Sequence, residues 1–494
     1  MPSDVFPDPL MHIAIVHYHL RPGGVTRVIR HSVRALMEKS VKVAVLSGSA
    51  PEEKWPCPIE VIEGLNYERD GNSTDRAARV LTGKMKQAAS RTLGRSPEIW
   101  HIHNHALGKN PALTLAVRRL VEEGQKFLLQ IHDFAEDGRP ELYRRLLDHT
   151  AGGDIELLGN IAYPRVNNVH YAVLNQRDAN FLLAAGADKT SIHRLPNPVV
   201  LPENDSLKRA VKWEGKRRFL YPTRALRRKN IGEALFWSGA GKPGDSFALT
   251  LAPTGRRDLM AYDSWKKYAR RRRLPVLFEV GMTATPLGCW MKAATAVITT
   301  SVAEGFGLAF LEPWLAGRPV AGRNLPEITN EFRESGVRLN GLYDRLEVPL
   351  AWVGPEKFRN ALVRSLQKSY RAYGRPLTPD AVERAHASAV RKNNVDFGRL
   401  NERLQMAVIE RLQNSPRLRS RIRPMELSSG LKGANLARNA GTVAKVYNQK
   451  QYGARLVKIY RTISESRSGP VTSLSAEQLL DQFLDPERFC LLRT

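Results

Sequence analysis

The stretch AEGFGLAFLEPW, residues 303–314, contains the features that decide how this chain folds. Two carboxylates, Glu304 and Glu312, bracket a Gly-Phe-Gly turn at 305–307, and an apolar run, AATAVITTS, precedes it at 293–301. A buried strand, a glycine turn and a helix start present free backbone N–H groups at a positive dipole end, which suits a phosphate or diphosphate. Neighbouring carboxylates accept hydrogen bonds from sugar hydroxyls. The stretch therefore indicates a site for a nucleotide-sugar.

The same residues also allow a purely structural interpretation. Ser301 and Glu304 have the spacing of a helix capping box, which needs no ligand. A continuous α-helix would turn Glu304 and Glu312 about 80° apart, so we expect Glu304 in the turn and Glu312 in the first turns of a helix. Proline is tolerated only near a helix start, so Pro313 means that this helix either begins late or is kinked.

The composition of the 494 residues, 42% hydrophobic and 25% charged, is that of a soluble globular protein of about two to three domains. Its three cysteines have no metal-like spacing, which favours a reducing compartment over a disulfide framework. No apolar run approaches the roughly 18 residues of a membrane span. The acidic, Pro-rich start of the chain is unlike a secretory signal. We therefore expect a cytoplasmic protein, either free or peripheral at the inner face of the membrane.

The formal net charge of +27 concerns binding partners rather than the fold. It is compatible with an anionic membrane, a phosphorylated acceptor or nucleic acid as a partner. Residues 355–424 hold 16 Lys and Arg against 6 Asp and Glu, a net charge of +10. Solvated helix faces are the simpler explanation of most basic clusters. No recognised nucleic-acid-binding module accompanies them, so no specific nucleic acid is expected.

Strand-like and helical segments alternate through the first two thirds of the chain. The strand-like runs are residues 11–17, 41–46, 59–62, 99–103, 127–131, 169–174, 192–195, 218–221, 247–251, 276–278 and 296–299. This alternation predicts an α/β protein with two doubly wound, Rossmann-like domains and parallel sheets. Ligands of such domains bind beyond the carboxyl ends of the strands.

The domain boundaries follow from the same alternation. A polar stretch after Pro196-Asn197-Pro198 is the expected linker. The predicted parts are a disordered tail at 1–10, an N-terminal domain at 11–198, a C-terminal domain at 199–335, a basic and mostly helical extension or insertion at 336–435, and at 436–494 a helix that packs back on the N-terminal domain plus a tail.

Two further groups of residues adjoin strand-like runs. Gly23-Gly24 precedes a helical pattern and would let a ligand approach backbone N–H groups, although a turn with positive φ would need glycine equally. Arg224 and Lys229 follow the run at 218–221. Fixed cations there would neutralise a diphosphate leaving group, and an ordinary basic loop is the alternative.

Histidines gather in the N-terminal domain. His132-Asp133 follows the run at 127–131, where an imidazole would contact a sugar hydroxyl or transfer a proton. The alternative is a structural histidine bonded to the neighbouring carboxylate. HIHNH at 101–105 places three histidines on one face if the strand continues. Zinc needs three or four ligands, and no Cys or carboxylate lies nearby, so we prefer a cluster that lines a cleft to a metal site.

Taken together, these features resemble the retaining, two-domain glycosyltransferases of the GT-B fold, and most closely family 4, also called group 1. The shared features are an early Gly-Gly turn, a histidine after a central strand, an interdomain Pro-Asn turn, an Arg-x4-Lys pair and an acid-x7-acid signature. They are matched, in chain order, by Gly23-Gly24, His132, Leu195 to Pro198, Arg224 and Lys229, and Glu304 and Glu312. The resemblance covers about 11–331 and returns weakly near 439–463, whereas 335–435 match no part of the family.

The resemblance implies a role for each matching residue. The N-terminal domain would bind the acceptor and the C-terminal domain the donor. The catalytic set would be His132, Glu304, Arg224 and Lys229; the donor-binding set Gly24, Met282, Phe306, Gly307, Leu308 and Glu312; and the acceptor-binding set Gly23 and Asp133. Glu304 would contact hydroxyls of the transferred sugar and Glu312 the ribose. Pro313 departs from the alanine that is usual after the second acid, which affects the reach of Glu312.

The function implied is retaining transfer of a hexose from a UDP- or GDP-sugar to an acceptor such as a glycolipid or a polysaccharide intermediate. No metal or cofactor is implied, because protein cations take the place of a metal. Two alternatives stay open. A phosphorylase or a sugar-nucleotide epimerase would keep the fold and change the chemistry. A non-enzymatic basic protein that binds nucleic acid or an anionic membrane would show binding that weakens steeply with salt.

Overall fold

The chain forms two compact units, Met1–Pro198 with Tyr447–Phe483, and Val199–Val446 with Leu484–Thr494. The structure is a computed structural model, and it describes residues 11–68, 75–201, 211–415, 417 and 433–493. The predicted tail at 1–10 and most of the basic cluster at 417–423 lie outside the described residues. Within the described ranges, none of the helices combines the length and the apolarity needed to cross a bilayer.

The first unit is built on a seven-stranded parallel sheet of order β3-β2-β1-β4-β5-β7-β8. The strands are β1 (His12–His17), β2 (Lys42–Ser47), β3 (Ile59–Val61), β4 (Ile99–His103), β5 (Phe127–Ile131), β7 (Val169–Val173) and β8 (Ile192–Arg194). Every residue of β1, β4, β5 and β7 is buried, as in a parallel sheet that is covered on both faces. The strand order reverses between β1 and β4, which is where open α/β sheets bind ligands.

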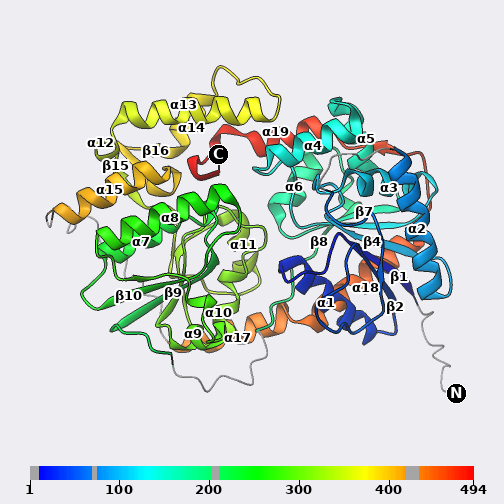
Figure 1. The fold of residues 1–494 in the computed structure, drawn as a ribbon, viewed down its shortest axis with the longest axis horizontal. Helices are drawn as coiled ribbons and strands as arrows, with labels where there is room; N and C mark the ends of the chain where they lie inside the picture. The colour runs from blue at the N-terminus through cyan, green and yellow to red at the C-terminus, as the bar shows by residue number, and fades with distance from the viewer. Residues whose placement is uncertain (1–10, 69–74, 202–210, 416, 418–432, 494) are drawn as a thin grey trace. The chain divides into compact units, whose positions relative to one another are not determined.

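Helices cover both faces of this sheet (Figure 1). They are α1 (Gly24–Met37), α2 (Asp75–Leu93), α3 (Pro111–Glu122), α4 (Pro140–Ala151), α5 (Ile155–Ala162), α6 (Gln176–Ala184) and α18 (Gln449–Glu465). Asn110 caps α3 through the backbone N–H of Leu113, and Asn448 caps α18 in the same way. The apolar face of α18, from Tyr452 to Ile463, is buried in one core with α1.

The second unit has a six-stranded parallel sheet of order β11-β10-β9-β12-β13-β14. Its strands are β9 (Arg217–Arg224), β10 (Asp245–Leu251), β11 (Val276–Leu277), β12 (Ala296–Thr299), β13 (Val320–Arg323) and β14 (Leu342–Tyr343). Its helices include α7 (Ile231–Ala240), α8 (Arg256–Arg271), α9 (Leu287–Ala293), α10 (Glu312–Leu315), α11 (Pro326–Glu334) and α17 (Gly433–Val446). The strand order reverses between β9 and β12. Sequence periodicity missed β13, a strand of four residues between β12 and β14, and β14, a strand of two residues at the sheet edge.

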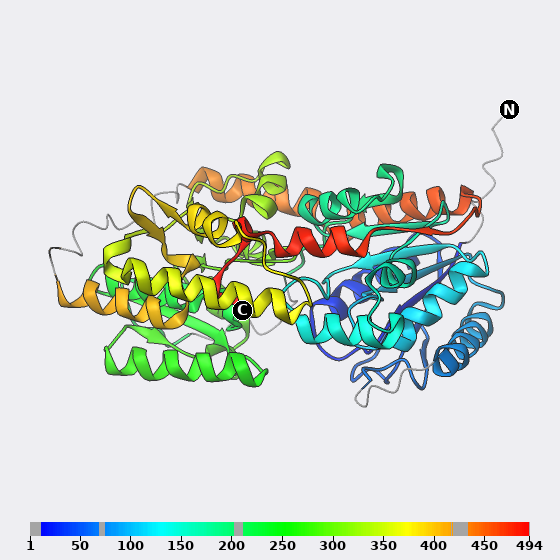
Figure 2. The same ribbon diagram turned by 90° about the horizontal axis from the view of Figure 1, so that it is seen from above.

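The described residues of the stretch 335–435, for which the sequence offered no family match, fold within the second unit. This stretch contains α12 (Leu350–Val353), α13 (Pro355–Ala372), α14 (Ala381–Ala389) and α15 (Glu402–Asn414), with a small antiparallel sheet of β15 (Glu347–Pro349), β16 (Val390–Arg391) and β17 (Asn394–Asp396). Its yellow and orange segments lie against the green part of the same unit in both views (Figures 1 and 2), and α15 packs on α7. A buried Arg323 at the end of β13 binds both Glu233 on α7 and Asp396 on β17.

Candidate functional site

The turn after β12 has the conformation that its sequence predicts. Residues 300–307 form neither helix nor strand and lead into the 3-10 helix η4 (Leu308–Phe310) and then α10. Gly307 has a φ of 86°, and a Cβ atom there would lie 2.8 Å from the Phe310 ring, so the position requires glycine. Glu312 is the first residue of α10 and Pro313 the second, where proline is tolerated. Glu304 therefore lies in the loop and Glu312 at the helix start, as predicted.

The capping-box interpretation of Ser301 and Glu304 is wrong. No helix starts between them, and Ser301 Oγ instead donates a hydrogen bond to Glu304 Oε1 at 2.6 Å. Ser301 Oγ also lies 2.8 Å from the hydroxyl of Tyr221, which is buried in β9. The serine therefore orients the carboxylate and ties its loop to the neighbouring strand.

Two cations hold the carboxylate of Glu304. Lys229 Nζ pairs with Oε1, and Arg228 Nη1 lies 3.3 Å from Oε2 while it donates to the carbonyl oxygen of Ala303 at 2.7 Å. Glu304 itself is only 9% exposed. Burial raises the pKa of Glu304, but the charges of Lys229 and Arg228 outweigh it and hold the pKa at about 2. The group is a fixed carboxylate beside two cations, which suits sugar hydroxyls and a diphosphate respectively.

Backbone bonds fix the two loops that carry these side chains. The backbone N–H of Val302 donates to the carbonyl oxygen of Arg228 at 2.9 Å. Thr300 Oγ1 donates to the carbonyl oxygen of Asn230 at 2.9 Å. Because β9 and β12 are neighbours in the sheet, their carboxyl ends bring both loops to one edge. The site is thus preorganised by the scaffold.

Arg224 does not join this group. It is the exposed last residue of β9, and its guanidinium donates to the carbonyl oxygen of Ala252 at 3.3 Å. The residue that the sequence missed is Arg228. Its only signal is the run Arg227-Arg228-Lys229, because the Arg-x4-Lys spacing does not include it. Sequence alone does not say which of three consecutive cations turns toward Glu304.

The remaining residues of the predicted donor-binding set differ in exposure. Met282 ends the 3-10 helix η3 (Val280–Met282) and is 73% exposed. Phe306 is buried and packs edge-on against Phe332, with ring centroids 5.6 Å apart, so its ring belongs to the core. Leu308 begins η4 and is partly exposed. Any contribution of Phe306 to a ligand would come from its backbone.

His132, in the first unit, belongs to a buried cluster of imidazoles. His103 Nδ1 and His132 Nε2 are hydrogen-bonded at 2.8 Å, and the two rings stack with centroids 5.1 Å apart. Burial lowers the pKa of His132 to about 3, so the ring is neutral at pH 7. The predicted structural alternative, a bond from His132 to Asp133, is wrong, because Asp133 pairs with Arg139. His132 is a neutral hydrogen-bonding group.

The histidines of 101–105 do not share one face. His101 and His103 stack at 4.4 Å, but β4 ends at His103 and Asn104 has a left-handed φ of 59°. His105 therefore turns away, and its Nε2 lies 2.7 Å from the carbonyl oxygen of Ala162. Asn104 Oδ1 accepts the backbone N–H of His132 at 2.7 Å. Among the residues that the structure describes, no three or more His, Cys, Asp or Glu side chains converge as metal ligands.

Gly23 and Gly24 lie where β1 leads into α1, which begins at Gly24. Gly23 has an extended φ of 178°, and neither glycine has the positive φ that the alternative interpretation required. A Cβ atom on Gly24 would meet no atom within 4 Å. The backbone at this helix start is therefore open to a close approach by a ligand.

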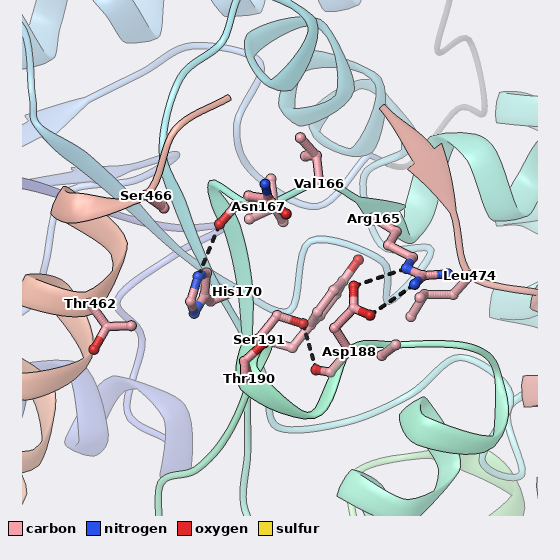
Figure 3. A pocket seen from close by; sticks show the side chains of 13 residues that line it. Arg165, Val166, Asn167, His170, Asp188, Thr190, Ser191, Thr462, Ser466 and Leu474 are labelled. Carbon is pink, nitrogen blue, oxygen red and sulfur yellow. Dashed lines mark hydrogen bonds and ion pairs between the residues drawn. The ribbon is translucent and has the colours of Figure 1, made fainter. Parts of the chain in front are cut away.

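A separate pocket of about 260 Å³ lies elsewhere in the first unit (Figure 3). It adjoins the amino ends of β7 and β8, opposite the edge where such sheets bind ligands. Its polar groups bond to one another: Arg165 pairs with Asp188 at 2.8 Å, and His170 Nε2 lies 3.1 Å from the carbonyl oxygen of Asn167. None of the predicted site residues lines it.

Comparisons with known proteins extend these observations. No protein-family model matches the chain. Mannosylglucosyl-3-phosphoglycerate synthase of Petrotoga mobilis is 27% identical over 380 residues, which cover 69% of this chain and 70% of the relative. Sucrose-phosphate synthase of Thermosynechococcus elongatus has a TM-score of 0.51 at 15% identity, over 91% of this chain and 98% of its own. Anabaena Alr3699/HepE in complex with UDP and glucose has a TM-score of 0.50 at 13% identity, over 91% of this chain and 98% of its own.

Proposed function

We propose that this chain, a glycosyltransferase with the GT-B fold, transfers a hexose from a UDP- or GDP-sugar to a hydroxyl acceptor with retention of configuration. The observation that supports the proposal most strongly is the ionised Glu304 beside Lys229 and Arg228, at the carboxyl edge of the second sheet. This combination matches the two parts of a nucleotide-sugar, an anionic diphosphate and a hydroxyl-bearing ring. The solved relative that contains UDP and glucose agrees with the choice of ligand class.

The two cations would act on the leaving group. As the bond between the sugar C1 atom and the diphosphate oxygen breaks, negative charge grows on the diphosphate, and Lys229 and Arg228 would stabilise it. Because both are already held in place, they need no reorganisation during the reaction. Backbone N–H groups of 306–308 would add further donors, and Arg224 would act at the more exposed rim.

The carboxylates would orient the donor. Glu304 would accept hydrogen bonds from hydroxyls of the transferred sugar, and Glu312 from the ribose. Met282, by its exposure, is suited to contact the base. The acceptor oxygen would bond to C1 on the face that the diphosphate leaves, and its proton would pass to the departing phosphate.

The first unit would supply groups for the sugar and the acceptor. His132, being neutral, would make a hydrogen bond to a sugar hydroxyl rather than carry a charge. Gly24 would let the diphosphate approach the start of α1. Gly23 and Asp133 are proposed to contact the acceptor.

The proposed acceptor is a glycolipid or a polysaccharide intermediate. We propose that the protein is cytoplasmic and makes peripheral contact with an anionic membrane. A phosphorylated glycoside is the second candidate. The net charge of +27 and the product named for the Petrotoga relative favour it.

A binding panel followed by product analysis tests this proposal. A ligand that binds only the folded chain raises the melting temperature by mass action, so UDP-, GDP- and other nucleotide-sugars are compared by thermal shift. We expect one of them to stabilise the chain and to release its nucleoside diphosphate only when an acceptor is present. Turnover that requires inorganic phosphate would instead indicate a phosphorylase, and interconversion of the sugar without an acceptor an epimerase.

A further inference from the structure

We infer that α15, in the stretch that matches no part of the family, positions the two cations that would bind the diphosphate. This inference rests on the proposed function of Arg228 and Lys229. Two side chains on one face of α15, Glu402 and Gln405, bind the residues that directly precede and follow this pair of cations (Figure 1 places α15 beside α7). The helix therefore holds the cation loop at both of its ends.

The first contact is an ion pair between Glu402 and Arg227. Arg227 Nε donates to Oε1 at 2.5 Å and Nη2 donates to Oε2 at 3.0 Å, which is the bidentate geometry with the best-defined orientation. Both side chains are mostly buried. The backbone N–H of Arg227 also donates to Asp258 Oδ1 at 2.8 Å. Arg227 thus serves to anchor the loop, which leaves the next two residues to carry the charge toward Glu304.

The second contact joins Gln405 to Asn230. Gln405 Nε2 donates to Asn230 Oδ1 at 2.8 Å, and Asn230 Nδ2 donates to Glu233 Oε2 at 2.8 Å. All three side chains are buried, and Gln405 is 0% exposed. Asn230 has a φ of 50°, a left-handed conformation that asparagine tolerates better than most residues. Its side chain therefore holds the backbone turn that directs Lys229 toward Glu304.

Close packing leaves little freedom at this junction. A Cβ atom on Gly232 would lie 2.2 Å from Gln405 Oε1, so α7 and α15 touch directly. Glu233 is in turn bound by Arg323, which also binds Asp396 from β17. The stretch beyond β14 is therefore built into the donor site through α7 and the cation loop.

The test compares a nucleoside diphosphate with the monophosphate of the same base. The cations would contact the outer phosphate, so their position sets the ratio of the dissociation constants for UMP and UDP. Gln405→Leu and Glu402→Gln should each lower this ratio about three- to tenfold, the value of one or two hydrogen bonds, while UMP binding changes less. Calorimetry measures both constants, and GDP with GMP forms a parallel series.

Controls separate positioning from general destabilisation. Gln413→Leu alters a glutamine on the same helix whose Nε2 donates to the carbonyl oxygen of Arg272 at 3.4 Å, away from the cation loop, and should leave the ratio unchanged. Asn230→Gly keeps the left-handed turn and should reproduce the effect of Gln405→Leu. The double variant should add little, because both changes remove the same contact.

Each outcome decides the inference. Folded Gln405→Leu and Glu402→Gln proteins that keep the wild-type ratio, or that lose UMP and UDP binding equally, overturn it. If Gln405→Leu fails to fold, the ratio of the UMP and UDP dissociation constants is measured in Asn230→Gly instead, and an unchanged ratio there overturns the inference. If the unaltered chain binds neither UDP nor GDP, the proposed function fails first and the inference fails with it.

Discussion

Lys229 and Glu304 form a buried ion pair although they are 75 residues apart in the sequence. They meet because β9 and β12 are adjacent and parallel, at the point where the strand order of the second sheet reverses. Each partner compensates the charge of the other away from water. Removing either one leaves a buried charge less well paired, which lowers stability.

Glu304→Gln should remove most of the turnover and leave the chain folded. The substitution keeps the shape of the side chain but weakens its ability to accept hydrogen bonds from sugar hydroxyls, so we expect kcat to fall about 100-fold or more. Nucleoside diphosphate binding should persist, because both cations remain. Initial rates and calorimetry measure the two effects. The control is Glu347→Gln, at a partly exposed carboxylate paired with Arg345, and near-normal rates for Glu304→Gln would contradict the assignment.

Lys229→Met should weaken the nucleoside diphosphate and abolish most turnover. Glu304 keeps only Arg228 as a charged partner, so the free energy of unfolding should also fall by about 1–3 kcal/mol. Denaturant titration and binding of UDP or GDP check both effects. Lys266→Met, at a lysine paired with Glu279 2.8 Å away, is the matched control and should change neither. Unaltered diphosphate binding in Lys229→Met would show that this lysine has another role.

The pH dependence of stability should report on Glu304. Its folded-state pKa of about 2 lies below the ordinary value of 4.5, so the unfolded chain takes up the proton first. The stabilisation is complete above pH 4.5 and is lost as the pH falls toward 2. It amounts to about 3 kcal/mol at most. We predict that the free energy of unfolding of Glu304→Gln falls less steeply than that of the unaltered chain between about pH 5 and 3. Urea titrations at several pH values measure this free energy, and the same pH dependence in both proteins would refute the prediction.

His132 should contribute no ionisation to the pH profile of kcat. Burial holds the pKa of His132 at about 3, so the ring stays neutral at pH 7 and well below it. His132→Gln should therefore lower kcat without removing a limb from the profile. His170→Gln, in a second hydrogen-bonded histidine pair of the same unit, is the control. A limb near pH 6.5 that disappears only in His132→Gln would identify His132 as a proton donor or acceptor.

Sequence reasoning was strongest where local pattern determines structure. The resemblance to GT-B glycosyltransferases and the doubly wound α/β fold are confirmed, and β12 has the predicted bounds, Ala296–Thr299. The turn at 305–307 was predictable because glycine and proline restrict the backbone locally. Roles assigned to the site residues by resemblance stay predictions.

Contacts between residues that are far apart in the chain could not be predicted from the sequence. Nothing in the run 227–229 shows that Arg227 turns to Glu402 while Arg228 turns to Glu304, since these partners are 175 and 76 residues away. Likewise, the alternation in HIHNH gave no sign that Asn104 would end the strand in a left-handed conformation. Such features depend on which strands become neighbours, and composition and spacing do not encode that directly.

A crystal structure of the chain with an intact UDP-sugar, and a second with a GDP-sugar, would test the central claim most directly. The account predicts, in one of them, a diphosphate within hydrogen-bond distance of Lys229 Nζ and the Arg228 guanidinium, with sugar hydroxyls on the Glu304 carboxylate. A nucleotide-sugar bound elsewhere, or these three side chains directed away from it, would contradict the account.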